Sequence, residues 1–428
     1  MKIQLLSKNI AFIAYYHKKN IFSLNAVIAA IETNEKIRDI NLYYVRNDQE
    51  LFQKLPLILA NNKLVIIGFS IFTKQFWDIS NIVRNLRSMY GNQIFLIAGG
   101  SHPSGDPEGT LKIGFDVIFL GESERSIIEF LLSMKKNEST QDIQGIAYYD
   151  EEKIIHINKK KYSIDLNQYP PFPLKNTKYG SIEITRGCPY MCYFCQTSFM
   201  MGNKVRYRSI DTICRYIKIM KDENLTDIRF ITPNAFSYGS IDGRTVNYSK
   251  LEELLSNVRS IIGAEGRIFY GSFPSEVRPE HVNNKNLSIV KKYANNDNIV
   301  IGAQSGSQDV LDYCNRAHNI DDIYQAVRNT INMGFKAYVD FIFGLPHETD
   351  NDREKTMETM KNLIDIGAKI NAHTFTPLPQ TPFYRKKISK IDEKTKKFLN
   401  DYNFKGKVFG NWREQEKLSI RIRNELNI

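Results

Sequence analysis

Short apolar runs alternate with helix-length amphipathic segments in two separate blocks of this 428-residue chain. In the first block, the segment at 76–91 is one such helix candidate. The alternation predicts a parallel sheet with helices on both faces, because parallel strands need crossover connections. Ligands of such sheets bind outside the carboxyl ends of the strands. The strands expected here are 2–7, 40–45, 64–71, 94–100 and 116–122.

The second block begins at residue 181 and again alternates apolar runs with helical segments. Its pattern predicts an open, incomplete barrel of six parallel strands, in which the chemistry lies at the carboxyl ends. The fold class is therefore α/β, with a doubly wound sheet, a partial barrel and a small C-terminal tail. The strands expected are 181–187, 227–234, 267–273, 298–306, 337–346 and 370–379.

Two features lie between the blocks. Residues 144–158 have the pattern of a β-hairpin, and the three prolines within 169–173 exclude a helix there and indicate a linker. We therefore expect four parts: a first domain at 1–140, a hairpin and linker at 141–175, a barrel domain at 176–384 and a C-terminal segment at 385–428.

Charge and hydropathy limit the partners. No apolar run reaches the roughly 20 residues of a membrane span, and the N-terminus lacks the order of a signal peptide, so we expect a cytoplasmic protein. The net charge is +11, but its lysines and arginines are scattered. This pattern favours a solvated basic surface and indicates neither a membrane nor a nucleic acid as partner.

Three of the five cysteines, Cys188, Cys192 and Cys195, lie within eight residues directly after the first strand of the second block. Three thiolates on one loop can ligate three irons of a [4Fe–4S] cluster and leave the fourth iron open. A zinc site is the alternative, but zinc normally has a fourth Cys or His at a recognisable spacing. Cys214 and Cys314 are expected to be buried cysteines outside the ligand set.

This Cys-x3-Cys-x2-Cys spacing, with Phe194 before the last cysteine, resembles the radical S-adenosylmethionine (SAM) enzymes. The resemblance implies that SAM chelates the open iron and is cleaved, after one-electron reduction, to a 5′-deoxyadenosyl radical. It also implies SAM contacts at successive strand ends. Each residue alone has an ordinary structural explanation, but their joint placement favours binding. These residues are Pro233, Asn234, Ser275, Glu276, Arg278, Gln304, Ser305, Phe343, Gly344 and His373.

The first domain resembles the cobalamin-binding domains that precede many radical SAM domains. Glycines let the backbone approach a bulky nucleotide tail, and amides at helix starts can bind its phosphate. A domain that binds another nucleotide, or none, is the alternative. The residues that carry this resemblance are Ser70, Thr73, Gly99, Gly100, His102, Gly121, Glu122 and Glu124.

One departure concerns the cobalt. The pattern Asp-x-His-x-x-Gly, whose histidine ligates cobalt in many cobalamin proteins, is absent, because Gly100 stands where the aspartate would precede His102. We therefore expect cobalamin with its own base displaced and no histidine on cobalt. Weak candidates for packing under the corrin are Trp77, Phe76 and either Tyr15 or Tyr16.

Three further runs, at 270–280, 302–307 and 410–415, resemble one archaeal subgroup of cobalamin-dependent radical SAM proteins that occurs among methanogens. The resemblance implies an oxygen-sensitive C-methyltransferase that moves a methyl group from SAM, through methylcobalamin, to an unactivated carbon. One implied carbon is the Cα of a glutamine in methyl-coenzyme M reductase. The substrate is then a protein, a peptide or a small molecule, which residues 385–428 would cover, and a ferredoxin or flavodoxin would donate electrons.

Three alternatives stay open. A cobalamin radical SAM enzyme can instead rearrange or cyclise its substrate. A methylthiolating tRNA enzyme would share the radical SAM core, but such enzymes carry extra cysteines in the first domain, and this chain has none before Cys188. A non-catalytic cobalamin carrier would leave the three-cysteine motif without a purpose.

Overall fold

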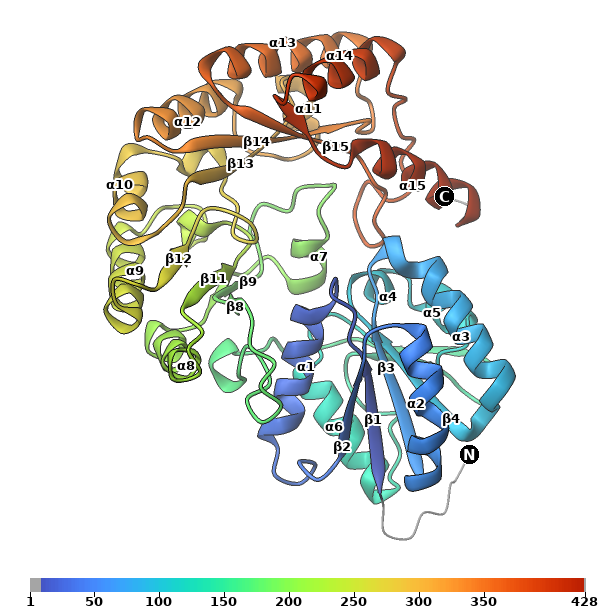
Figure 1. The fold of residues 1–428 in the computed structure, drawn as a ribbon. Coiled ribbons are helices and arrows are strands. Elements are labelled where there is room, and N and C mark those ends of the chain that lie inside the picture. The colour runs from blue at the N-terminus through green and yellow to red at the C-terminus, as the bar shows by residue number, and fades with distance from the viewer. Residues whose placement is uncertain (1–8, 427–428) are drawn as a thin grey trace. The chain divides into compact units, whose positions relative to one another are not determined.

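Two units, Met1–Gly180 and Ser181–Ile428, make up the chain in the computed structural model, which describes residues 9–426 (Figure 1). Each unit has its own sheet. The division follows the proline-rich linker at 169–173 by a few residues.

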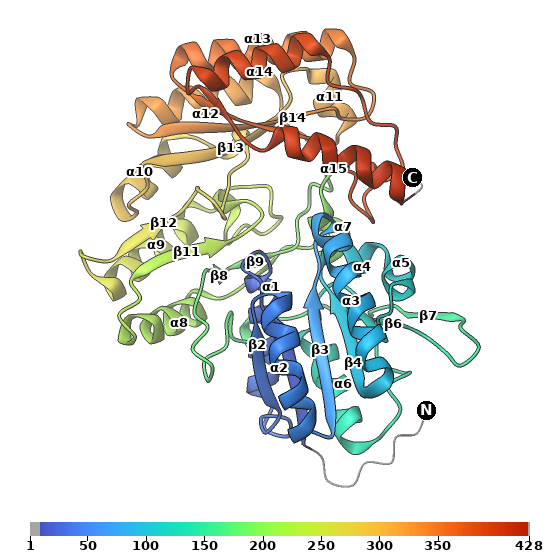
Figure 2. The same ribbon diagram turned by 45° about the vertical axis from the view of Figure 1, so that its right-hand side comes forward.

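The first unit contains the expected doubly wound parallel sheet. Its order is β2-β1-β3-β4-β5, with the antiparallel hairpin β6–β7 added at the edge of β5, where Figure 2 shows it. Crossover helices lie on both faces because consecutive parallel strands need them. The strands are β1 (Ile10–Tyr15), β2 (Asn41–Val45), β3 (Leu64–Ser70), β4 (Ile94–Gly99), β5 (Val117–Phe119), β6 (Ile146–Tyr149) and β7 (Ile155–Asn158).

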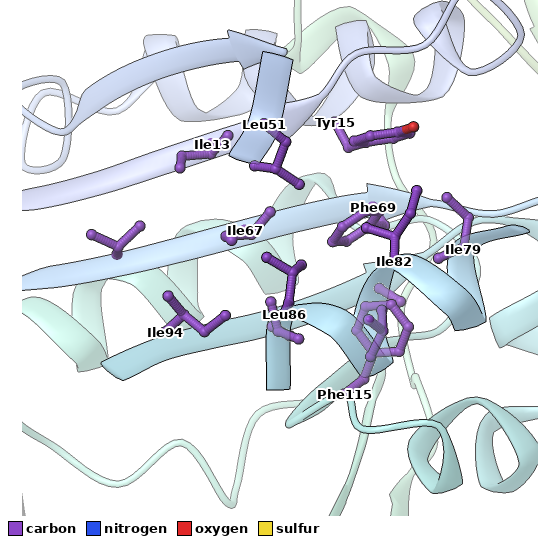
Figure 3. Packing of buried hydrophobic residues seen from close by; sticks show 14 of the residues in the cluster. Ile13, Tyr15, Leu51, Ile67, Phe69, Ile79, Ile82, Leu86, Ile94 and Phe115 are labelled. Atoms are coloured by element: carbon purple, nitrogen blue, oxygen red, sulfur yellow. The ribbon is translucent and has the colours of Figure 1, made fainter. Parts of the chain in front are cut away.

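Two apolar clusters hold the helices against this sheet. On one face, α2 (Asp48–Asn61) and α3 (Phe76–Tyr90) bury side chains such as Leu51 and Leu86 against Ile67, as Figure 3 shows. On the other face, α1 (Ile21–Thr33) and α6 (Glu124–Lys136) pack in the same way. The short helices α4 (Ser101–Gly105) and α5 (Pro107–Lys112) follow β4.

The first strand differs from the expectation. The run expected at 2–7 lies outside the described residues, and the strand that enters the sheet is β1, Ile10–Tyr15. All six of its residues are buried because β2 and β3 pair with it on both sides. The sequence of a strand that is covered on both faces is a continuous apolar run, so its pattern resembles that of a buried helix.

The second unit contains parallel strands in consecutive order. One sheet has the order β8-β11-β12 and another β13-β14-β15-β16, and a parallel bridge between Val277 and Ile301 connects the loop after β12 to β13. This succession is the expected incomplete barrel. Its strands are β8 (Ile182–Glu183), β11 (Asp227–Ile231), β12 (Arg267–Phe269), β13 (Asn298–Gln304), β14 (Lys336–Phe343), β15 (Lys369–Thr374) and β16 (Val408–Phe409); a short ribbon pairs β9 (Thr185–Arg186) with β10 (Arg206–Tyr207).

Amphipathic helices cover the outside of this sheet. Capping boxes begin two of them, since Asn319 pairs with Asp322 and Thr349 with Asp352. Asp352 also accepts the Ser307 hydroxyl at 2.6 Å, which ties the start of α13 to the segment after β13. The helices are α7 (Gln196–Met201), α8 (Ile210–Asp222), α9 (Tyr248–Ile262), α10 (Asn284–Tyr293), α11 (Gln308–Tyr313), α12 (Ile320–Asn332), α13 (Asp350–Ile366), α14 (Glu393–Phe404) and α15 (Trp412–Glu425).

The C-terminal segment contributes to the sheet as well as to the helices. Its α14 lies beside α13 in both views (Figures 1 and 2), and the two helices share the Lys394–Glu354 ion pair. The two-residue strand β16 pairs with β15, an addition that the charged, helical pattern of this segment did not predict. Among the helices of residues 9–426, none is long and apolar enough to cross a membrane.

Candidate cofactor sites

The three clustered cysteines lie in the loop between β9 and α7. Hydrogen bonds fix its backbone: the Cys188 amide donates to the Gly202 carbonyl at 3.1 Å, and the Ser198 hydroxyl donates to the Cys188 carbonyl at 2.8 Å. Asn315 donates its side-chain amide to the Tyr190 carbonyl at 2.8 Å. The loop is therefore attached to the protein at Cys188, where it begins, and at Tyr190.

Phe194 anchors the loop to the apolar interior. It packs against a buried cluster that includes Val310, Leu345 and Phe383. Two backbone hydrogen bonds run beside it, from the Tyr193 amide to the Cys314 carbonyl at 3.1 Å and from the Phe383 amide to the Tyr193 carbonyl at 3.2 Å. In this structure the aromatic residue before the last cysteine is thus a packing residue.

Two buried arginines point at the middle cysteine. The Nη1 atoms of Arg316 and Arg278 lie 3.5 Å and 3.8 Å from the Sγ atom of Cys192. Arg278 also donates through Nε to Glu280 at 2.5 Å, and its guanidinium carbon lies 3.5 Å from the centroid of the Tyr190 ring. A guanidinium carries only donors, so its N–H groups suit an anionic sulfur.

The chemistry of these donors fits an iron–sulfur cluster. Burial raises the pKa of the Cys188 and Cys195 thiols, and coordination to a metal would deprotonate them outright. Residues 9–426 hold no group of three or more His, Cys, Asp or Glu side chains already disposed around a metal position. The fit therefore depends on three thiols in one anchored loop and on the cations beside Cys192.

Several residues expected to contact SAM are engaged with the protein. Asn234 lies between two loops, with its side-chain amide 2.7 Å from Nδ1 of His281 and its oxygen 3.2 Å from the Arg278 amide. Ser275 donates its hydroxyl to the Ser272 carbonyl at 2.8 Å, and the Ser305 hydroxyl accepts from the Ser307 amide at 3.1 Å. These side chains shape the strand ends.

The remaining SAM candidates divide by exposure. Phe343 is fully buried, while Gly344 adopts φ +77° and donates its amide to Glu348. Pro233 follows β11 and directly precedes Asn234. Gln304 adopts φ +78°, at a register shift between β13 and β14. Gln304, unlike Phe343, is only half-buried.

Asp340 on β14 was not singled out from the sequence, and it lies beside the expected SAM contact His373 on β15. Asp340 accepts the Asn371 side-chain amide at 2.8 Å and lies 3.7 Å from Nε2 of His373. Gln415 of α15 reaches Nδ1 of the same histidine at 3.3 Å. Burial raises the pKa of Glu276, and the Asp340 charge adds to this effect. The signal that the sequence offered for Asp340 was a single acidic residue inside the apolar run of β14.

In the first unit, the candidate cobalamin residues gather at the carboxyl ends of β3, β4 and β5. Ser70 ends β3, and its hydroxyl lies 2.7 Å from that of Ser23. Gly99 ends β4, and Gly100 follows with φ +96°. A Cβ on Gly100 would lie 2.9 Å from the Ile71 amide, so only glycine fits there.

His102 is fully buried, and its Nδ1 lies 3.2 Å from the Thr73 hydroxyl. Its ring lies 4.4 Å from that of Phe76, and burial lowers its pKa to about 4. Phe76 is thereby a core residue, and Tyr15 also packs in the core, against Phe69 at 5.0 Å. His102 is therefore enclosed by protein, with a buried Nε2 that has no hydrogen-bond partner among the described residues, and the absence of a histidine on cobalt stays a prediction.

The other candidates of this unit lie after β5. Gly121 has φ +61°, and its amide donates to the Ser104 hydroxyl at 2.8 Å. Glu122 is buried and accepts the Ile164 amide at 3.3 Å. Glu124 is buried at the start of α6. Both carboxylates are therefore enclosed by protein.

The remaining aromatic candidates, and one missed residue, lie near the first strand and α3. Trp77 is half-buried beside Phe76, and Tyr16 donates its hydroxyl to Asn25 at 2.5 Å. Asn20, which precedes α1, donates to the Ser70 carbonyl, and its buried Oδ1 has no hydrogen-bond partner in the part of the chain that the structure describes. Because the first strand was expected at 2–7, no sequence pattern placed Asn20 at a strand end.

Two family models match the two units. Residues 28–131 match the B12 binding domain, and residues 182–360 match the radical SAM superfamily. The radical SAM domain implies a [4Fe–4S] cluster and SAM, and the B12-binding domain implies cobalamin. These matches agree with the cofactors expected from the sequence.

Known proteins are similar over most of the chain. An uncharacterized methyltransferase of Pyrococcus horikoshii is 23% identical over 352 residues, which cover 79% of this chain and 72% of that protein. A tRNA-2-methylthio-N(6)-dimethylallyladenosine synthase of Buchnera aphidicola is 28% identical over 253 residues, which cover 55% and 53%.

The fold is also similar to a solved structure, the radical SAM methyltransferase TsrM from Kitasatospora setae with cobalamin and a [4Fe–4S] cluster bound. The TM-score is 0.68 at 14% identity, and the match covers 89% of this chain and 77% of TsrM. It supports the α/β architecture with a B12-binding sheet before a radical SAM domain. From the two family matches, the chain combines a B12-binding domain with a radical SAM domain.

Proposed function

We propose that this enzyme is a C-methyltransferase that moves a methyl group from SAM, through cobalamin, to an unactivated carbon. The observation that carries the proposal is the anchored three-cysteine loop in a chain that also has a B12-binding domain. The cofactors supply the radical and methyl-transfer chemistry, and the protein supplies binding, orientation and exclusion of side reactions.

The residues of the chain have separate tasks in this proposal. Cys188, Cys192 and Cys195 hold the cluster, and Arg278 and Arg316 place positive charge beside it. The half-buried polar side chains of β14 and β15, among them Asp340 and His373, remain to orient SAM or substrate.

For the substrate, we propose the Cα of a glutamine in methyl-coenzyme M reductase. The proposal is supported by the three sequence runs that resemble a methanogen subgroup, one of which lies at the end of β15. There the Trp412 carbonyl accepts the Thr374 hydroxyl at 2.7 Å, and Gln415 accepts the Thr374 amide at 3.0 Å. These contacts support our proposal that the segment 385–428 covers the substrate, and a ferredoxin or flavodoxin is the proposed electron donor.

The first experiment is anaerobic purification and cluster reconstitution, followed by absorption spectra with and without hydroxocobalamin. Corrin bands that survive desalting, beside iron–sulfur absorbance, support the two-cofactor enzyme. Alanine at any one of Cys188, Cys192 or Cys195 should abolish both the cluster and SAM cleavage, whereas Cys214→Ala should leave the iron content unchanged. Retained SAM cleavage in any of the three variants contradicts the ligand assignment.

Product analysis tests the reaction itself. Incubation with peptides of methyl-coenzyme M reductase should add the mass of one methyl group to a glutamine residue. A product of unchanged mass favours rearrangement or cyclisation.

The similarity to the Buchnera tRNA enzyme keeps methylthiolation of tRNA as a second candidate. That reaction adds a methylthio group to an adenosine and requires RNA binding, which weakens as salt is raised. Salt-sensitive binding of tRNA by this chain, together with a methylthiolated nucleoside, favours the second candidate.

A further inference from the structure

We propose that Arg278 and Arg316 form a charge clamp on Cys192 that sets the reduction potential of the cluster. The inference rests on the proposed ligand role of Cys192. Both guanidinium groups belong to the same unit as the cysteine, although Arg316 is 124 residues away from it in sequence.

Both arginines are removed from water, so they need partners. Arg278 is 5% exposed, Arg316 is 7% exposed, and the Cys192 residue between them is 5% exposed. A buried cation is costly unless it is paired and hydrogen-bonded. Cys192 is the partner that the two share, since each directs one Nη1 at its sulfur.

The remaining contacts hold the two arginines in place. Arg278 donates through Nη2 to the Arg316 carbonyl, and Arg316 donates through Nη2 to the Gly302 carbonyl at 2.6 Å. The residues on either side, Asn315 and Ala317, adopt φ +57° and +54°. Left-handed backbone is uncommon for a residue such as alanine, so this loop has an unusual course that brings Arg316 to the sulfur.

The charges around Cys192 leave a positive excess. Two guanidinium cations face one carboxylate, Glu280, whose Oε1 accepts from Arg278. His318 lies 3.8 Å from the other oxygen of Glu280, and its Nε2 donates to the Ala303 carbonyl at 3.1 Å. Burial lowers the pKa of His318 to about 2, so this imidazole is neutral. The two arginines, the carboxylate and the neutral histidine together carry one net positive charge.

This positive charge affects the reduction potential of the cluster. Reduction adds one negative charge to a cluster, and both nearby cations and hydrogen bonds to the sulfurs favour the reduced form. The clamp therefore makes the cluster easier to reduce, which is the step that precedes SAM cleavage. Removing one guanidinium should make reduction harder, and removing the carboxylate should make it easier.

The test is the midpoint potential of the reconstituted, SAM-free enzyme, measured by a dye-mediated redox titration with detection of the reduced cluster by electron paramagnetic resonance. In Arg316→Gln, the ratio of reduced to oxidised cluster at a fixed potential should fall at least tenfold, a shift of about 59 mV to more negative potential for one electron. Arg278→Gln should shift it in the same direction, and Glu280→Gln in the opposite direction.

Arg244→Gln is the matched control. Arg244 lies 4.9 Å from the centroid of the same Tyr190 ring that stacks on Arg278, but it is exposed and donates to the Pro189 carbonyl. Its midpoint should equal that of the unmodified enzyme. Iron and sulfide are assayed in every sample, so that a midpoint is compared only between proteins with full clusters.

If Arg316→Gln fails to retain iron, Arg316→Lys is measured in its place, because lysine keeps the positive charge. At the fixed potential, its ratio of reduced to oxidised cluster should differ from that of the unmodified enzyme by less than tenfold. A fully loaded Arg316→Gln enzyme with an unchanged midpoint overturns the inference, and so does a Glu280→Gln shift in the same direction as the arginine variants. Cys192→Ala separates the two proposals: a full cluster in that variant refutes the ligand role of Cys192, whereas unchanged potentials in the arginine variants refute only the charge clamp.

Discussion

Glu348 is a carboxylate whose side chain is fully buried, and its replacement by glutamine should make stability less sensitive to pH. Its Oε2 accepts the Gly344 amide at 2.7 Å, whereas its Oε1 has no hydrogen-bond partner within residues 9–426. Burial raises its pKa from 4.5 to about 7. Arg353 lies 3.7 Å away but also serves Asp350 and Asp392, so burial is the larger effect.

The magnitude follows from the difference between the folded and unfolded pKa values. Each pKa unit corresponds to about 1.4 kcal/mol, so a rise from 4.5 to about 7 corresponds to about 3 kcal/mol. The folded state binds the extra proton between these values, so the contribution of Glu348 to stability is complete below pH 4.5 and is lost as the pH rises through 7. Glu348→Gln should therefore gain about 3 kcal/mol relative to the parent between pH 4.5 and pH 8.

The two tryptophans of the chain give the assay, because Trp77 lies in the first unit and Trp412 is buried in the second. In a Trp77→Phe background, Trp412 fluorescence reports urea unfolding of the unit that holds Glu348. The exposed Glu354, which pairs with Lys394 at the surface, supplies the control Glu354→Gln. Equal differences between Glu348→Gln and its parent at pH 5 and pH 8 would refute the reasoning.

Two further substitutions test the strand ends. Gly100→Ala should destabilise the first unit by about 2 kcal/mol or more, since φ is +96° and the new Cβ would lie 2.9 Å from the Ile71 amide; thermal unfolding measures this loss, and corrin retained after desalting should fall with it. Asn234→Ala should cost about 2–5 kcal/mol because it leaves the Arg278 amide and His281 without their buried partner. Urea unfolding checks the cost, and a loss below about 1 kcal/mol would contradict it.

Most of the fold could be predicted because each element has a local pattern. Strands from 40–45 onward were placed by short apolar runs, and helices such as α3 by their amphipathic spacing. The first strand could not be placed in the same way. The runs at 2–7 and 10–15 are both apolar, and the pairing of β1 with β2 and β3 is a long-range property that the local sequence does not contain.

The site was predictable to the extent that residue type and position along a strand decide it. The three cysteines and the strand ends satisfied both conditions. Arg316 satisfied neither, because it lies in an irregular turn between α11 and α12, and its approach to Cys192 depends on how the whole barrel closes. Asp340 was missed for another reason. It interrupts an apolar strand, and only the burial pattern of the structure shows that it lies on the half-buried face.

Arg278 shows what residue type alone does not reveal. It was expected among the SAM contacts, and a guanidinium is well suited to binding a carboxylate because it can donate two parallel N–H bonds. In the structure, Nε, Nη1 and Nη2 already donate to Glu280, Cys192 and the Arg316 carbonyl, and one face of the group stacks on Tyr190. Three of its five N–H groups are thereby engaged inside the protein, where an unmade hydrogen bond costs most. The fold has therefore directed this cation toward the cluster loop, and a contact between Arg278 and SAM stays a prediction.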